Sequence, residues 1–146
     1  MVRYTDDSIV PIPRDRLRRL LDLHAGDDQI PKIHPEVVSQ QTVAQASGEF
    51  TARRGVRMLR KVVTATWRVS FAPGERYRWE VLDGNGPWTP GSYVETVYSD
   101  VPEGTRLRTE GELTIAGFPG FLQNRLVRLV LGRIDREDLG YLAKNP

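Results

Sequence analysis

The chain has 146 residues, 39% hydrophobic and 27% charged, a balance typical of one globular domain over residues 1–146. The net charge is only +2, and acids are interleaved with the arginines, so we expect no nucleic-acid partner. The absence of cysteine excludes disulfides, thiolate catalysis and Cys-based metal sites. No signal peptide or long apolar run is found, which predicts a cytoplasmic protein without membrane insertion.

The first quarter of the chain predicts one strand followed by two short helices. Residues 2–12 are typical of a strand, and residues 14–23 of a helix that begins after a proline. A second short helix is expected over residues 28–34. It ends at His34, because the residue before a proline avoids the helical region. The apolar residues that these helices turn inward are Leu17, Leu20, Leu21, Ile30 and Ile33.

From residue 36 onward, the sequence predicts five or six antiparallel strands joined by turns. Apolar and polar residues alternate most clearly after residue 62, which gives each strand one apolar and one charged face. The polar triplet Arg53-Arg54-Gly55 is expected to form a turn or a hairpin tip. The predicted strands cover residues 37–46, 56–71, 76–82, 92–99 and 105–115.

The long segment 118–143 is the one with a clear helical period. Charged residues such as Arg125 and Arg128 fall on one side of this predicted helix. Glu137 interrupts the opposite, apolar side, where a carboxylate is costly unless it is paired or protonated. The apolar arc is predicted to contain Leu122, Leu126, Val127, Leu129, Val130, Ile134 and Tyr141.

These elements predict an α+β fold in which a curved antiparallel sheet wraps around the long C-terminal helix. Strands with one apolar face form a sheet with one face in water and the other covered. The only predicted element long enough to cover that face is the helix over 118–143. The two short helices come after the first strand.

The order of elements resembles the helix-grip fold of the START, birch-pollen-allergen and polyketide-cyclase superfamily (SRPBCC). The segment 9–13 followed by 17–21 is similar to the family's first strand and helix. The segment 33–38 is similar to the end of its second helix and the start of its second strand. The stretches 91–96 and 104–107 resemble its last two strands with their Gly-Thr-Arg turn.

The resemblance implies a cavity between the sheet and the terminal helix, with its mouth near the short helices. Relatives use such a cavity to bind lipids, hormones and other apolar molecules, or to cyclise and dehydrate polyketide intermediates. The fold alone does not decide between these activities.

Aromatic residues on the apolar strand faces are the first candidates for the cavity wall. Trp67 and Trp79 share a face with the aliphatic residues of their strands, and Tyr98 lies on the more apolar face of its own strand. They either stack on a flat ligand or fill an ordinary core. On the helix, Leu126 and Val130 are the expected lining residues.

His34 and Glu137 are the polar candidates for the site. Glu137 could act as a general acid or base or bind a polar ligand group, or it could simply pair with Arg133 one turn earlier. His34 lies where the cavity mouth is expected, as a ligand contact or proton carrier, or as an ordinary turn residue. The two histidines lack carboxylates at a metal-binding spacing, so we expect no metal and no cofactor.

The leading hypothesis from sequence is therefore a protein that binds an apolar or amphipathic small molecule, lipid-like or polyketide-like, between sheet and helix. One alternative is an enzyme of the polyketide cyclase or dehydratase kind, which would hold its substrate folded in the same cavity. The other is a protein-interaction module whose concave surface meets another chain.

Overall fold

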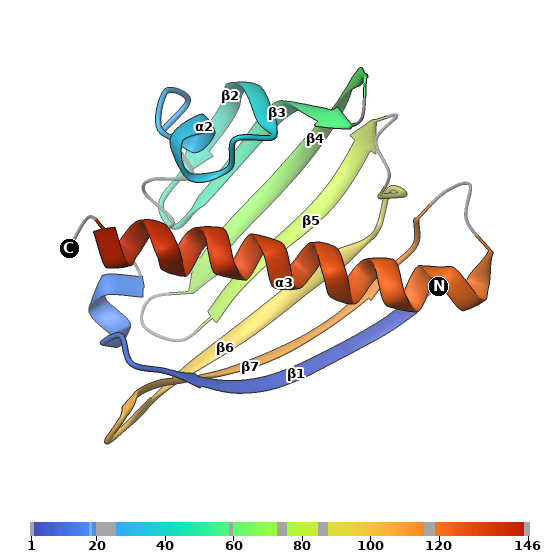
Figure 1. The fold of residues 1–146 in the computed structure, drawn as a ribbon. Helices are drawn as coiled ribbons and strands as arrows, with labels where there is room; N and C mark the ends of the chain where they lie inside the picture. The colour runs from blue at the N-terminus through green and yellow to red at the C-terminus, as the bar shows by residue number, and fades with distance from the viewer. Residues whose placement is uncertain are drawn as a thin grey trace.

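The computed structural model describes residues 2–17, 19, 26–58, 60–72, 76–84, 88–115 and 119–144. Seven antiparallel strands form one curved sheet, and the long helix α3 (Gly120–Lys144) runs across it (Figure 1). This arrangement confirms the predicted α+β helix-grip architecture. In the part of the chain that is described, no helix is long and apolar enough to cross a membrane.

The sheet brings the first strand beside the last. Its order is β1-β7-β6-β5-β4-β3-β2, so β1 pairs with β7 and places Val2 opposite Leu113. The remaining strands pair with their sequence neighbours, as short turns require. The strands are β1 (Val2–Val10), β2 (Val37–Ala46), β3 (Glu49–Met58), β4 (Lys61–Ala72), β5 (Arg76–Gly84), β6 (Tyr93–Val101) and β7 (Gly104–Leu113).

The short helices lie between β1 and β2. Residues 14–17 are helical, whereas Leu20, Leu21 and the rest of that predicted helix, with His24, lie outside the described residues. The second helix, α2 (Ile30–Ile33), buries both of its isoleucines. His34 follows in an extended conformation, as expected before a proline.

The predicted turn at Arg53-Arg54-Gly55 is wrong, because these residues lie inside β3. They pair with β2 on one side and with β4 on the other, and the chain reverses only near residue 60. Alternation explains the error: Arg53 faces water, whereas Arg54 shares the inner face with the buried Phe50. When both faces of a strand carry charged side chains, the sequence lacks the apolar alternation of a strand and resembles that of a turn.

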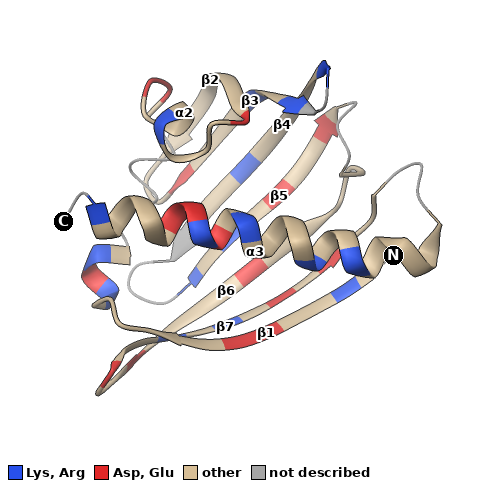
Figure 2. Cartoon of the chain, viewed as in Figure 1, with Lys and Arg blue, Asp and Glu red and all other residues tan. Residues whose placement is uncertain are grey.

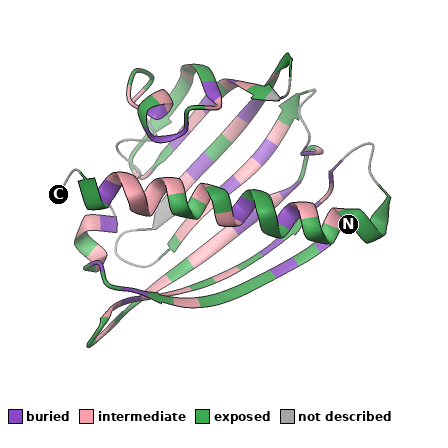
Figure 3. Ribbon diagram, viewed as in Figure 1, coloured by how far each residue is buried: buried purple, intermediate pink, exposed green. Residues whose placement is uncertain are grey.

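The buried side of α3 is narrower than the predicted arc. Val127, Leu131 and Leu142 are buried, but Leu129 is 62% exposed. Residues two apart on a helix point about 200° apart, so Leu129 cannot share a face with Val127. Figure 3 shows that buried and exposed stretches follow one another along α3.

The outer face of the sheet carries the mixed-charge pairs predicted for a solvated surface. Lys and Arg alternate with Asp and Glu across neighbouring strands (Figure 2). Arg68 lies 2.6 Å from Glu80, and Arg106 lies 2.6 Å from Asp7. Such exposed pairs are screened by water and contribute little to stability, so the apolar interior holds the structure together.

The apolar core is divided into two clusters. The larger cluster contains Phe50, Val81, Leu113 and Leu131, and the smaller one joins Leu17 and Leu142 to the end of β1. The cavity described next is lined by members of both clusters. The space between sheet and helix is therefore only partly filled by side chains.

Candidate functional site

A cavity of about 690 Å³ lies between the sheet and α3. This volume is in the range of pockets that enclose a small molecule. The sheet, the segment after α2 and α3 all contribute to its wall. Its aromatic lining residues are Tyr4, Trp67, Tyr77, Trp79, Trp88 and Tyr98.

Three tryptophans form one continuous part of this wall. The ring centroids of Trp67 and Trp79 are 5.0 Å apart and tilted by 56°, and Trp79 lies 6.1 Å from Trp88 at 54°. Tilted contacts at these distances are favourable for aromatic rings. The indole Nε1 of Trp67 is buried, and no hydrogen-bond partner is found for it among the described residues. The wall therefore holds a hydrogen-bond donor without an acceptor.

Tyr77 and Tyr98 are two of the three tyrosines that add hydroxyl groups to the wall. Tyr77 and Tyr98 line the cavity, whereas Tyr93 packs under the guanidinium of Arg78, 4.2 Å from its ring centre. Burial raises the pKa of Tyr77 and of Tyr98 above the usual value, and the charge of Asp138 raises both further. Both phenols therefore stay neutral at physiological pH.

Arg54 projects from β3 into this apolar environment. Its Nε donates to Gln40 Oε1 at 2.6 Å, and its guanidinium carbon lies 5.9 Å from the Trp67 ring centre. Its Nη2 is buried, and within the described residues it has no hydrogen-bond acceptor. Burial lowers the pKa of Arg54, but an arginine side chain remains charged in proteins.

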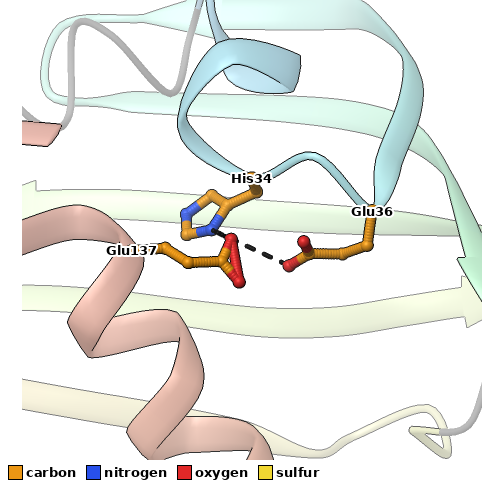
Figure 4. A group of neighbouring side chains, drawn as sticks. All are labelled: His34, Glu36 and Glu137. Carbon is orange, nitrogen blue, oxygen red and sulfur yellow. Dashed lines mark hydrogen bonds and ion pairs between the residues drawn. The ribbon is translucent and has the colours of Figure 1, made fainter. Parts of the chain in front are cut away.

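A cluster of ionisable groups lies where α2, β2 and α3 meet. His34 is only 5% exposed, and its Nδ1 lies 3.0 Å from Glu137 Oε2 and 3.8 Å from Glu36 Oε1 (Figure 4). Its Nε2 lies 2.9 Å from Asp138 Oδ1. The imidazole thus joins the start of β2 to the last third of α3, about a hundred residues later in the chain.

The carboxylates around His34 control its protonation. Burial alone would lower the pKa of His34, but hydrogen bonds and charges from Asp138 and Glu137 outweigh burial and raise it. Burial also raises the pKa of Glu36, and the charge of Glu137 adds to this effect. At the cavity wall, burial and then the charge of Asp138 raise the pKa of Asp135 to about 6.

The structure places six of the seven sequence-predicted site residues around the cavity, namely Trp67, Trp79, Tyr98, Leu126, Val130 and His34. Glu137 is not among the described residues that line it. Its carboxylate bonds Arg133 Nε at 3.1 Å, as the helical spacing suggested, and also contacts His34. Glu137 therefore forms the ordinary structural ion pair with Arg133, and it also contacts His34.

Sequence reasoning missed four charged residues of this region. Arg54 was assigned to a turn, although its alternation with Phe50 and Ala52 was the signal for an inward position. Glu36 and Asp138 were overlooked beside His34 and Glu137. Contrary to expectation, His34 has suitably placed carboxylates: Glu36 lies two residues away in the chain, and Glu137 and Asp138 come from α3. The four missed residues are Glu36, Arg54, Asp135 and Asp138.

The fold and cavity define a helix-grip protein, and comparisons with known proteins agree. The family model described as "Polyketide cyclase / dehydrase and lipid transport" matches residues 1–145. The chain belongs to this family, within the superfamily that its sequence resembles. A search of curated proteins finds none that matches the chain.

Solved structures show the same fold at low sequence identity. The structure of Ara h 8.0201 has a TM-score of 0.78 at 16% identity, with 99% of each chain covered. A START superfamily protein from Mycobacterium smegmatis has a TM-score of 0.74 at 14% identity, over 99% of this chain and 98% of that one. The di-domain aromatase/cyclase StfQ of the steffimycin pathway has a TM-score of 0.76 at 16% identity, over 97% of this chain and 49% of StfQ.

Proposed function

We propose that this protein binds an amphipathic small molecule in the cavity, with an apolar, preferably aromatic, body and an acidic or carbonyl oxygen. The observation that carries this proposal is a pair of buried donors on neighbouring strands of the cavity wall, Arg54 Nη2 and Trp67 Nε1, for which no acceptor is found among the described residues. Leaving a buried donor unpaired costs about 1–3 kcal/mol. A ligand oxygen that accepts from these groups removes that cost.

The rest of the cavity supports the same class of ligand. Trp67, Trp79 and Trp88 offer ring faces and edges, and Leu126 and Val130 of α3 offer aliphatic contacts on the opposite side. The ligand's apolar body would lie between them. The neutral hydroxyls of two cavity tyrosines would supply directional hydrogen bonds.

The test compares two probes that differ only in their polar group, dodecanoate and dodecanol. We expect both to change the tryptophan fluorescence of the full chain, with the carboxylate bound more tightly. The variant Arg54→Met should weaken dodecanoate by about tenfold or more and leave dodecanol nearly unchanged. The control is Arg53→Met, a neighbour on the outer face of the same strand.

The outcomes separate the possibilities clearly. If neither probe binds, and native mass spectrometry of protein from its own host shows no co-purifying molecule, the binding proposal fails. If Arg54→Met weakens both probes equally, the arginine shapes the cavity and does not recognise the acidic group.

A polyketide cyclase or dehydratase activity is the second candidate function. His34 lines the cavity and is held between two carboxylates, which gives it fixed partners for a proton that it would exchange with a substrate. Glu137 contacts this histidine but is not among the described residues that line the cavity, whereas Glu36 and Asp138 beside it are. A cyclase would turn over a linear poly-β-keto thioester, and His34→Gln would abolish turnover while the fluorescent change on binding persisted.

A further inference from the structure

Three potential metal ligands from separate parts of the chain converge beside the cavity. His34 Nδ1 follows α2, Glu36 Oε1 precedes β2, and Glu137 Oε2 comes from α3. All three atoms lie within 4.8 Å of one another, and Figure 4 shows both carboxylates directed at the imidazole. We propose that these three side chains form a binding site for a divalent transition-metal ion such as Zn²⁺.

Asp138 orients the histidine for this role. Its Oδ1 lies 2.9 Å from Nε2, on the side of the ring opposite the two glutamates. A carboxylate that accepts from one ring nitrogen fixes the tautomer in which the other nitrogen presents a lone pair, and metal-binding histidines commonly have such a partner.

Glu36 provides a second, independent observation at this cluster. Its Oε2 is buried, and among the described residues no hydrogen-bond donor is found for it. Arg133 Nη2 lies 4.0 Å from this oxygen while its Nε bonds Glu137, and His34 faces the other oxygen of Glu36. A buried carboxylate oxygen requires a donor or a metal, and a dication among these carboxylates would supply it.

The donor set indicates which ion would bind. One imidazole and two carboxylates suit Zn²⁺, Mn²⁺, Fe²⁺ or Co²⁺, whereas Mg²⁺ and Ca²⁺ prefer oxygen ligands alone. Three protein ligands leave at least one coordination position for water or for an oxygen of a bound molecule. Because His34 and Glu36 also line the cavity, the open position would be accessible from it.

The test is calorimetric titration of the chelator-treated full chain with ZnCl₂, together with the visible absorption spectrum of the Co²⁺-loaded protein. We expect about one ion per chain at micromolar affinity or tighter, and a Co²⁺ spectrum that shows nitrogen ligation. Glu36→Gln and Glu137→Gln should each weaken Zn²⁺ by more than tenfold. Asp138→Asn should weaken it by about 10–100-fold, because the histidine loses its orienting partner.

Two matched variants serve as controls. Glu112→Gln makes the same neutralising change on the exposed outer face of β7, and His24→Gln removes the only other histidine of the chain. Both should bind Zn²⁺ like the unmodified protein. Thermal melts without metal verify that each cluster variant folds, and a folded variant without the Co²⁺ spectrum supports the site.

The proposal is overturned if no ion binds at about 1 mM Zn²⁺, or if binding survives unchanged in both glutamine variants of the cluster. It is also overturned if His24→Gln removes the binding, which would show an unrelated site. The cavity's affinity for dodecanoate plays no part in this readout. The metal proposal and the proposed ligand-binding function can therefore fail separately.

Discussion

The rings of Trp67 and Trp79 meet 5.0 Å apart on adjacent strands, and Trp79 also contacts Trp88. Trp79 is nearly buried and belongs to the larger core cluster, whereas Trp67 only packs against that cluster. We therefore expect Trp79→Ala to lower the free energy of unfolding by about 3–5 kcal/mol. Trp67→Phe should cost far less, because it keeps most ring contacts and removes an unpaired N–H. Urea denaturation of the two variants measures the difference, and equal losses would contradict it.

Substitution of Arg54 is expected to raise the free energy of unfolding. Replacing it with methionine removes a desolvated cation with an unsatisfied Nη2, while the side chain still fills space beside Trp67. In the absence of ligand we expect Arg54→Met to raise the free energy of unfolding by about 1–3 kcal/mol. Arg53→Met, on the water-facing side of β3, should change it little. Destabilisation by Arg54→Met would mean that the bond to Gln40 outweighs the cost of desolvation.

Tyr77 and Tyr98 in the cavity wall predict how stability responds to alkaline pH. Burial, and then nearby negative charge, raises the pKa of Tyr77 and of Tyr98 in the folded protein above the value near 10 of the unfolded chain. Above that value the unfolded chain releases these protons first, so stability is complete below pH 10 and falls as pH rises further. Absorbance at 295 nm should show a late-titrating component that coincides with unfolding. Tyr77→Phe and Tyr98→Phe should each reduce its amplitude.

Two glycines should respond in opposite ways to alanine. A Cβ on Gly111 would lie 2.3 Å from the carbonyl oxygen of Tyr93, so Gly111→Ala forces β6 and β7 apart. Gly140 lies in α3 with no atom near its Cβ position, and alanine there should stabilise the helix by about 0.5–1 kcal/mol. Melting temperatures measured side by side should fall for the first variant and rise for the second.

The architecture could be predicted from the sequence, because strand alternation and helical period depend only on the spacing of nearby residues. The bounds of β2 and the burial of Ile30 and Ile33 follow from such signals alone. The errors share a physical cause. The predicted helical arc is too wide and so includes Leu129, and the polar triplet at 53–55 hides the strand alternation at Arg54. The position of each side chain depends on which way one residue of a strand or helix points.

The ionisable cluster was beyond sequence reasoning for a different cause. Glu36 and Glu137 are brought together because α3 packs against α2, which ends just before His34, and the two segments lie about a hundred residues apart in the chain. No local sequence pattern predicts that Glu36 and Glu137 lie close together. The spacing His34-x-Glu36 and the pair Glu137-Asp138 were visible, but only the fold shows that they face each other.

The pairing of β1 with β7 sets the order in which the protein can fold. Val2 of β1 pairs with Leu113 of β7. In the described sheet β7 is the only strand beside β1, so all the residues between them must be synthesised before β1 can pair. Such distant pairing closes a long loop, which slows folding. On the ribosome, the β2–β3–β4–β5 meander can assemble early from neighbouring hairpins, whereas the N-terminal strand waits until the last hairpin emerges.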